Sequence, residues 1–202
     1  MQVCFSLQAV GFMLALGFLT PQTPEILATE LKPQTLEAFE RYVKAAEGRI
    51  EKELARPETF LYVDTLPEPR RSAVRGALGR GEIHMERLQT RDSQGRELEA
   101  PDGLIHHWMG AVFIPAATLP QALNLVQDYD RHQDIYKPEV VRSKLVERNG
   151  NDFKIFYRLR KKKVITVTLN SDHDVHYFPV DGKRWHSRSY TTRIAEVADA
   201  DQ

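Results

Sequence analysis

The side chains best suited to acid–base chemistry lie in the last hydrophobic stretch of the chain, residues 185–196. His186, Arg188 and Tyr190 alternate there, so on a β-strand they share one face, and Ile194 is expected on that face too. A histidine or tyrosine inside an apolar cavity has a shifted pKa and can polarise a carbonyl or hydroxyl group of a ligand. We expect this face to line the interior of the protein. If it points outward, the interior is lined instead by Trp185, Ser187, Ser189 and Thr191.

An acidic cluster has the residue types of a calcium loop. Its members are Asp128, Asp130, His132, Asp134 and Glu139. A calcium loop needs glycine at its sixth position for a sharp turn, whereas Gln133 stands there and Pro138 restricts the backbone before the last ligand. We therefore expect a solvated helix end rather than a calcium site.

A second polar cluster consists of Asp172, Asp174 and His176, with His173 among them. On a strand the first three would share a face and could take a metal ion. No partner ligands elsewhere are fixed by the sequence, so we interpret the cluster as a polar hairpin between two strands. The sequence predicts no metal and no other cofactor.

The balance of charge argues against polyanionic partners. The 28 basic residues equal the 28 acidic ones, so no surplus positive charge is present to hold nucleic acid. Arg158, Arg160 and the lysines at 161–163 form a basic run, which we interpret as a hairpin tip that discourages edge pairing, with phosphate or lipid-headgroup contact as the alternative. The sequence has no nucleophile elbow, phosphate loop or dinucleotide-binding glycine pattern, so binding is favoured over catalysis.

The first 24 residues lack Lys, Arg, Asp and Glu, and residues 3–20 are mostly apolar. This length lies between a secretory signal and a short membrane span. We expect residues 1–24 to be an export signal, which predicts a periplasmic or secreted protein; a retained membrane anchor or a buried helix are the alternatives. The one cysteine of the chain, Cys4, lies in this segment, so no disulfide is expected.

Residues 25–100 are expected to form a helical N-terminal region with a short strand pair. Apolar residues at steps of three and four predict an amphipathic helix over Thr35–Leu54. They are Leu36, Phe39, Val43, Ala46, Ile50 and Leu54. A shorter helix is expected over Pro67–Leu78 and a strand over Glu82–Thr90.

Residues 101–202 read as a second domain, which begins with a strand over Ile105–Ile114. Thr118 and Gln121 predict a capping box that opens a helix reaching Tyr129. Consecutive strands follow over Val140–Glu147, Phe153–Leu159, Val164–Leu169, Val175–Phe178 and Trp185–Glu196, with a hairpin turn at Asn149–Gly150. Because no crossover helices separate these strands, we predict an α+β fold with an antiparallel sheet.

The order of these elements resembles the helix-grip superfamily over residues 104–196. The matching features are a strand ending at Pro115, a helix closing in Val126, Asp128 and Tyr129, the turn Ile135-Tyr136-Lys137-Pro138, and the strand Val141–Leu145 with its hairpin. This superfamily includes the steroidogenic-acute-regulatory-related (START) lipid-transfer domains, polyketide cyclases, coenzyme-Q-binding proteins and birch-allergen-like proteins. The resemblance implies a curved sheet around a long C-terminal helix, with a hydrophobic ligand between them.

The chain departs from that pattern at its end. After Glu196 it stops at Gln202, so we expect this START-like domain to be incomplete at its C-terminus; the alternative is that the helix over Thr35–Leu54 covers the sheet. A cavity between the sheet and the helix from Thr118 to Tyr129 is expected to hold a lipid, sterol, quinone or polyketide-like molecule. The residues expected to line it are Trp108, Tyr136, Ile155, Tyr157, Leu159, Val167, Tyr177, His186, Arg188 and Tyr190.

Two other functions stay open. One is a cyclase-like enzyme in which His186 or Tyr190 positions an enolisable carbonyl group. The other is an interaction protein that offers the open edge of its sheet to a partner strand. Association with a membrane through residues 3–20 is also an expectation.

Overall fold

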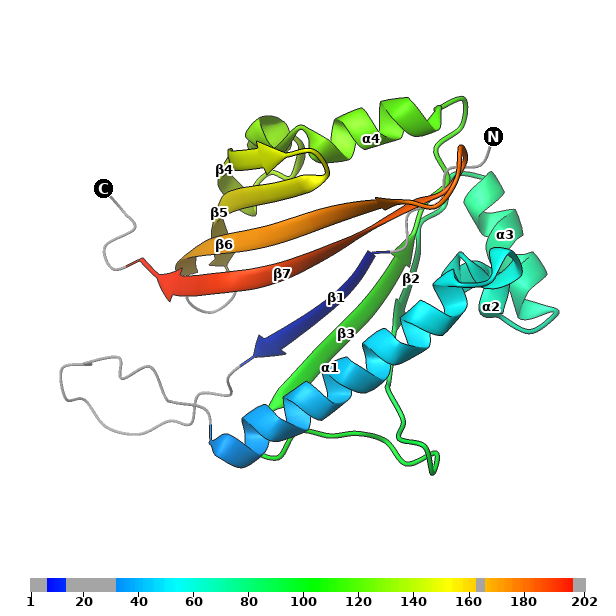
Figure 1. The fold of residues 1–202 in the computed structure, drawn as a ribbon, viewed down its shortest axis with the longest axis horizontal. Helices are drawn as coiled ribbons and strands as arrows, with labels where there is room; N and C mark the ends of the chain where they lie inside the picture. The colour runs from blue at the N-terminus through cyan, green and yellow to red at the C-terminus, as the bar shows by residue number, and fades with distance from the viewer. Residues whose placement is uncertain (1–6, 14–31, 163–165, 198–202) are drawn as a thin grey trace. The chain divides into compact units, whose positions relative to one another are not determined.

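The computed structural model describes residues 7–13, for which it defines the backbone alone, 32–162 and 166–197. The chain divides into two compact units, residues 1–116 and 117–202, and each combines helices with an antiparallel sheet (Figure 1). The first unit contains β1 (Leu7–Met13), α1 (Pro33–Leu54), η1 (Pro57–Thr59), α2 (Tyr62–Thr65), α3 (Arg70–Gly79), β2 (His84–Arg87) and β3 (Leu104–Ala111). The second contains α4 (Leu119–Gln127), η2 (Tyr129–Arg131), α5 (His132–Ile135), β4 (Val140–Asn149), β5 (Asp152–Lys162), β6 (Thr166–Pro179) and β7 (Trp185–Glu196).

This architecture confirms the predicted fold class, α+β with a curved antiparallel sheet, a packed helix and a helical segment before it. The division of the chain differs from the predicted boundary at residues 100/101, because β3 pairs within the first unit. Residues 7–13 of the predicted leader form β1, which pairs with β3. The rest of that leader lies outside the described residues. No helix in the described part of the chain is both long and apolar enough to cross a membrane.

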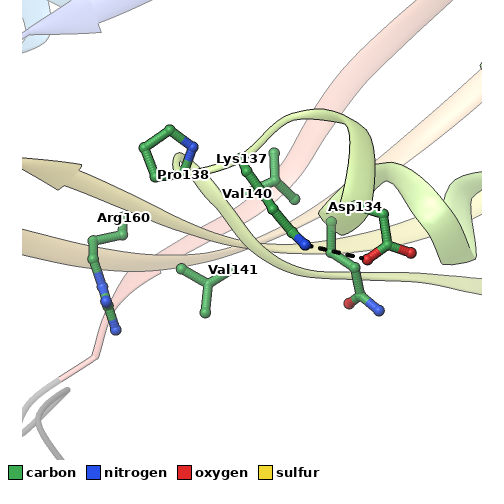
Figure 2. A pocket seen from close by; sticks show the side chains of 7 residues that line it. Asp134, Lys137, Pro138, Val140, Val141 and Arg160 are labelled. Carbon is green, nitrogen blue, oxygen red and sulfur yellow. Dashed lines mark ion pairs between the residues drawn. The ribbon is translucent and has the colours of Figure 1, made fainter.

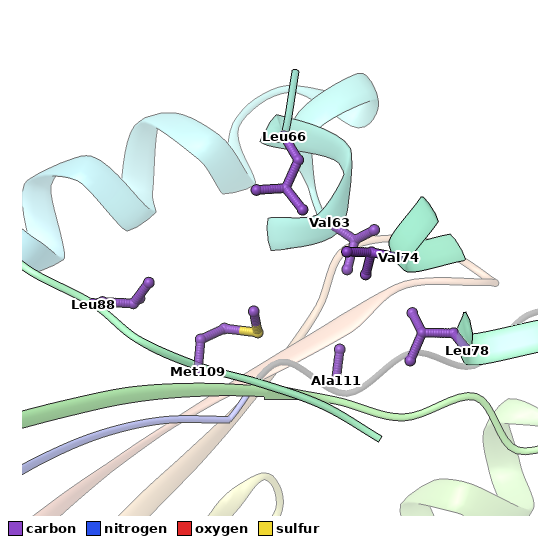
Figure 3. Close-up of a cluster of buried hydrophobic side chains, with 7 residues drawn as sticks. All are labelled: Val63, Leu66, Val74, Leu78, Leu88, Met109 and Ala111. Atoms are coloured by element: carbon purple, nitrogen blue, oxygen red, sulfur yellow. The ribbon is translucent and has the colours of Figure 1, made fainter. Parts of the chain in front are cut away.

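The sheet of the first unit has the order β1-β3-β2. Alternation along β3 buries His107, Met109 and Ala111 on one face and leaves Trp108 on the other, 41% exposed. Helix α1 contacts the buried face, where the Tyr42 hydroxyl lies 2.9 Å from His107 Nδ1. Side chains of α2 and α3 complete the core (Figure 3). It comprises Val63, Leu66, Val74, Leu78, Leu88, Met109 and Ala111.

Helix α1 forms where the sequence predicts it, but of the predicted stripe only Ala46 is fully buried. Its buried residues are Thr35, Ala38, Tyr42 and Ala46. Leu36, expected in the core, is 43% exposed. The orientation follows polar contacts that periodicity does not reveal: Thr35 Oγ1 donates to the Pro101 carbonyl at 2.8 Å, and Tyr42 meets His107.

The sheet of the second unit has the order β4-β5-β6-β7, with every neighbouring pair antiparallel. The predicted hairpin at Asn149–Gly150 joins β4 to β5, with Gly150 at φ +59°. Strand β6 runs unbroken through the segment predicted to be a polar hairpin, so that prediction is wrong. Asp172, Asp174 and His176 occupy one face of β6, where Asp172 pairs with Arg193 and His176 with Asp152. A strand accommodates such residues because only its other face packs against a helix.

Strand β7 has the predicted bounds but not the predicted arrangement of faces. Its pairing with β6 shifts register beside Asp172 and His173, so Thr192 is an extra residue in the ladder. The bulge places Ile194 on the face of Ser189 and Thr191, rather than on that of His186. The expectation that Ile194 shares a face with His186, Arg188 and Tyr190 is therefore wrong.

Candidate functional site

One face of the four-stranded sheet carries four aligned rows of side chains, because Cα partners in an antiparallel pair project to the same side. Across β5, β6 and β7 the rows are Phe153–Val175–Ser189, Ile155–His173–Thr191, Tyr157–Ser171–Ile194 and Leu159–Leu169–Glu196. We call this side the helix face, because the helical segments of the second unit pack on it.

Helix α4 begins at the predicted capping box, in which Thr118 and Gln121 are hydrogen-bonded to each other. The segment that follows places Tyr129 against the first rows, with its ring 5.6 Å from that of Phe153 and its hydroxyl 2.7 Å from the Tyr177 hydroxyl. Tyr129, Phe153 and Tyr177 are each at most 5% exposed. Side chains thus fill this half of the space between α4 and the sheet, where we expected a cavity.

His132 links α5 to β5. Its Nδ1 atom lies 2.6 Å from the Tyr157 hydroxyl, and its ring stacks on Tyr157 at an interplanar angle of 12°. Burial lowers the pKa of His132 and raises that of Tyr157. The contact is therefore a hydrogen bond between two neutral groups, in which the tautomer of the ring decides the donor. Nε2 is buried without a hydrogen-bond partner among the described residues, although the backbone of Leu125 and Val126 is near enough to favour the charged ring.

His173 continues this polar line towards β7. Its Nε2 lies 2.9 Å from Ser171 Oγ and its Nδ1 3.2 Å from Thr191 Oγ1, and its ring meets Tyr157 edge-on at 5.5 Å. Burial lowers the pKa of His173, so this ring is neutral as well. The site therefore presents uncharged groups that can each donate or accept a hydrogen bond.

Beyond His173 the helix face is less covered. Ile194 is 63% exposed and Thr191 is exposed, whereas Leu159 and Leu169 in the adjacent row are half-buried. We call this surface, formed by Leu159, Val167, Leu169, Thr191 and Ile194, the open half of the helix face. It combines apolar side chains with the neutral His173 group at its border.

The structure brings some of the predicted lining residues together. Tyr177, Ile155, Tyr157, Leu159 and Val167 lie on the helix face, the first two buried in its packed half. Tyr136 is 49% exposed and meets the His132 ring edge-on. Trp108 belongs to β3 of the other unit.

The remaining predicted residues, His186, Arg188 and Tyr190, lie on the opposite face of the sheet. His186 stacks on Phe178, with ring centroids 4.6 Å apart. Burial lowers its pKa, and Arg188 and His176 lower it further. The expectation that this face looks towards the helix is wrong; the alternative set from Trp185 to Thr191 takes that side, and Trp185 packs against the buried cluster.

The principal polar residues of the site, His132 and His173, were missed as ligand-binding candidates. His132 appeared in the sequence only as part of the calcium-like spacing, and His173 as the odd member of an acidic cluster. Pairing across strands brings them together, and no signal in a single sequence fixes that pairing.

The acidic clusters do not form metal sites within the described residues, where no group of three or more His, Cys, Asp or Glu side chains could hold an ion. Asp130 accepts a hydrogen bond from the Leu145 amide at 2.9 Å, which ties the helical segment to β4. Asp134 faces Lys137 instead, at 3.7 Å.

A pocket of about 420 Å³ lies at the turn between α5 and β4 (Figure 2). It is lined by Gln133, Asp134, Lys137, Pro138, Val140, Val141 and Arg160. The pocket shares no residue with the open half of the helix face, but it adjoins that surface, because Val140 is the Cα partner of Leu159.

No protein-family model, curated protein or solved structure matches the chain.

Proposed function

We propose that the protein binds an uncharged apolar molecule with a carbonyl or hydroxyl group on the open half of the helix face. The observation that carries this proposal is the juxtaposition of His173, held between Ser171 and Thr191, with the exposed Ile194. A ketone, quinone or sterol has the matching chemistry, an apolar body with one or two hydrogen-bonding groups. The resemblance to the helix-grip superfamily favours the same class of ligand.

The neutral state of the site supports an uncharged ligand over an ionic one. Both His132 and His173 have pKa values lowered by burial, and the Tyr157 hydroxyl has a raised pKa. A charged ligand group beside His173 would lose its hydration without meeting an opposite charge in the rows of Ile155 and Tyr157. Glu196, in the row of Leu159 and Leu169, would repel an anionic ligand. A carbonyl group needs one donor, which the hydroxyl of Thr191 can supply by rotating away from His173.

The energy available from such a surface is sufficient. Burial of about 300 Å² of apolar ligand surface, at about 25 cal/mol per Å², contributes on the order of 7 kcal/mol before the cost of association. Few polar contacts are then required, which agrees with a sequence that has no catalytic motif. The proposed site is defined by the hydrogen-bonding groups of His173 and Thr191 beside an apolar surface.

The test uses the full-length chain and Nile red, a neutral apolar dye with a carbonyl group. Ile194→Asp places a charge on the open half and is expected to weaken dye binding at least about tenfold, because the carboxylate must be desolvated. Val146→Asp is the matched control, since Val146 is 58% exposed on β4 of the same sheet. Equal dye affinity for the two variants would contradict the proposal, as would the absence of saturable dye binding by the unsubstituted chain.

The exposed edge of β7 favours a second function, strand addition by a protein partner. Among the residues that the structure describes, β7 pairs only with β6, and side chains from Ser189 to Ile194 are exposed. Thr192→Pro removes a backbone donor at the bulge and is expected to abolish association if this edge is the docking strand. Unchanged association, measured by sedimentation over a range of concentrations, would exclude that edge.

A further inference from the structure

The pocket at the α5–β4 turn has a composition unlike that of the helix face. Val140, Val141 and Pro138 supply apolar surface, and charged groups stand on either side of them. Figure 2 shows Arg160 on one side of Val141 and the Lys137–Asp134 pair on the other. The pocket is an open depression of about 420 Å³, a volume that accommodates a small molecule while leaving part of it in solvent.

Arg160 is distinguished from its basic neighbours by its lack of partners. Arg158 donates through Nε to Asn170 Oδ1 at 3.0 Å, and Lys161 pairs with Glu139 at 2.6 Å. The guanidinium of Arg160 has no hydrogen bond or ion pair with any residue that the structure describes, while its backbone amide is held by the Glu139 carbonyl at 2.8 Å. Strand β5 thus holds the backbone of Arg160 in place, and the five N–H donors of its guanidinium are available to a ligand.

The charges around the pocket select the kind of anion. Arg160 and Lys137 are positive and Asp134 is negative, so their formal sum is one positive charge. A single carboxylate cancels that charge and fits the planar guanidinium through two parallel hydrogen bonds. A phosphate dianion would exceed it and be repelled by the Asp134 carboxylate.

We propose that this pocket binds a small organic carboxylate, with the carboxylate on Arg160 and a compact apolar body against Val140, Val141 and Pro138. The site adjoins the open half of the helix face, where Val140 pairs with Leu159, but it shares no residue with it, so Arg160 tests this proposal and Ile194 tests the proposed function. It gives Arg160 a role different from the hairpin tip and the phosphate or lipid-headgroup contact that the sequence suggested for the basic run.

Benzoate is the probe, added to the ¹⁵N-labelled full-length chain and followed by amide chemical shifts. Saturable shifts are expected at residues 133–137, 139–141 and 160, since Pro138 has no amide proton. Benzyl alcohol has the same ring without the charge, and phenyl phosphate has a second negative charge; both are expected to bind more weakly. Shifts distributed elsewhere, or benzyl alcohol binding as well as benzoate, would overturn the proposal. Tighter binding of phenyl phosphate would overturn the assignment to a carboxylate.

Substitutions of Arg160 provide the second part of this test. Arg160→Gln is expected to weaken benzoate binding about tenfold, the effect of losing a charge-assisted hydrogen bond, and Arg160→Lys to give an intermediate affinity. Lys162→Gln removes the same charge two residues along β5, outside the pocket, and is the matched control. An affinity of Arg160→Gln equal to that of Lys162→Gln would refute the role of Arg160. Arg160→Lys keeps the test decisive if the glutamine variant does not fold.

Discussion

His132 Nδ1 lies 2.6 Å from the Tyr157 hydroxyl, and this contact joins α5 to β5 across 25 positions of sequence. His132 is 4% exposed, and burial keeps both partners neutral. The pair therefore contributes a part-buried hydrogen bond between uncharged groups, at the border between the packed and open halves of the helix face.

Removal of the Tyr157 hydroxyl should destabilise the second unit. Tyr157→Phe leaves His132 Nδ1 buried without its hydrogen-bond partner, which costs about 1–3 kcal/mol. The measurement is urea unfolding followed by Trp185 fluorescence in a Trp108→Phe background. Tyr136→Phe is the control, because Tyr136 is 49% exposed and the substitution keeps its ring contact with His132. A smaller loss for Tyr157→Phe than for Tyr136→Phe would contradict the account.

His107 should make the first unit sensitive to acid. Burial, assisted by the charge of Arg49, lowers its pKa from 6.5 to about 4. Below pH 6.5 the unfolded chain takes up a proton that the folded unit excludes, so the contribution of His107 is present above pH 6.5 and is lost as the pH falls towards 4. The loss reaches about 3 kcal/mol over this interval.

The pH dependence of His107→Gln provides the comparison. Urea unfolding is followed by Trp108 fluorescence in a Trp185→Phe background, at several pH values between 6.5 and 4. The unsubstituted His107 chain should lose stability more steeply than the glutamine variant, whatever the variant's stability at neutral pH. Parallel curves for the two chains would show that His107 titrates alike in the folded and unfolded states.

Phe153 should be the most sensitive position of the second core. It is 2% exposed, and its ring meets those of Tyr129 and Tyr177 edge-on. Phe153→Ala is expected to cost about 3–5 kcal/mol, by lost burial and by the cavity that remains. Phe156→Ala, on the opposite face of β5 and only half-buried, should cost less. Chemical denaturation distinguishes them, and an equal cost would mean that the helix face does not hold the core.

The capping box at the start of α4 should stabilise the second unit modestly. Gln121 Oε1 accepts from the Thr118 amide at 2.8 Å, and Thr118 Oγ1 accepts from the Gln121 amide at 3.4 Å. Thr118→Ala should lower the free energy of unfolding by about 1 kcal/mol, whereas Thr118→Ser, which keeps the hydroxyl, should change it little. Thermal unfolding gives both values, and an equal loss for serine and alanine would show that the hydroxyl is not the stabilising group.

Local sequence signals predicted most of the elements because each has a local physical cause. Thr118 and Gln121 define a helix start through contacts three residues apart, and Asn149–Gly150 defines a hairpin through the turn that glycine permits. The amphipathic pattern gave α1, and the succession of strands without crossover helices gave the antiparallel sheet of the second unit.

Features that depend on pairing between distant segments were beyond those signals. The bulge at Thr192, which moves Ile194 to the helix face, is a property of the β6–β7 ladder and has no glycine to mark it. The sequence predicted two strands where the single strand β6 is found, because a run of acidic residues is typical of a turn. In the structure Asp172 has a partner on the neighbouring strand β7, which allows the run to continue as a strand. The contact of His132 with Tyr157 likewise requires knowledge of which helix lies on which strand.

The central claim, that an uncharged apolar ligand binds the open half of the helix face, is tested most directly by intermolecular NOEs from Nile red to ¹³C-labelled methyl groups of the full-length chain. The account predicts NOEs to Leu159, Leu169 and Ile194, and their loss in Ile194→Asp. NOEs confined to Val140 and Val141, or to the first unit, would place the dye elsewhere and contradict it.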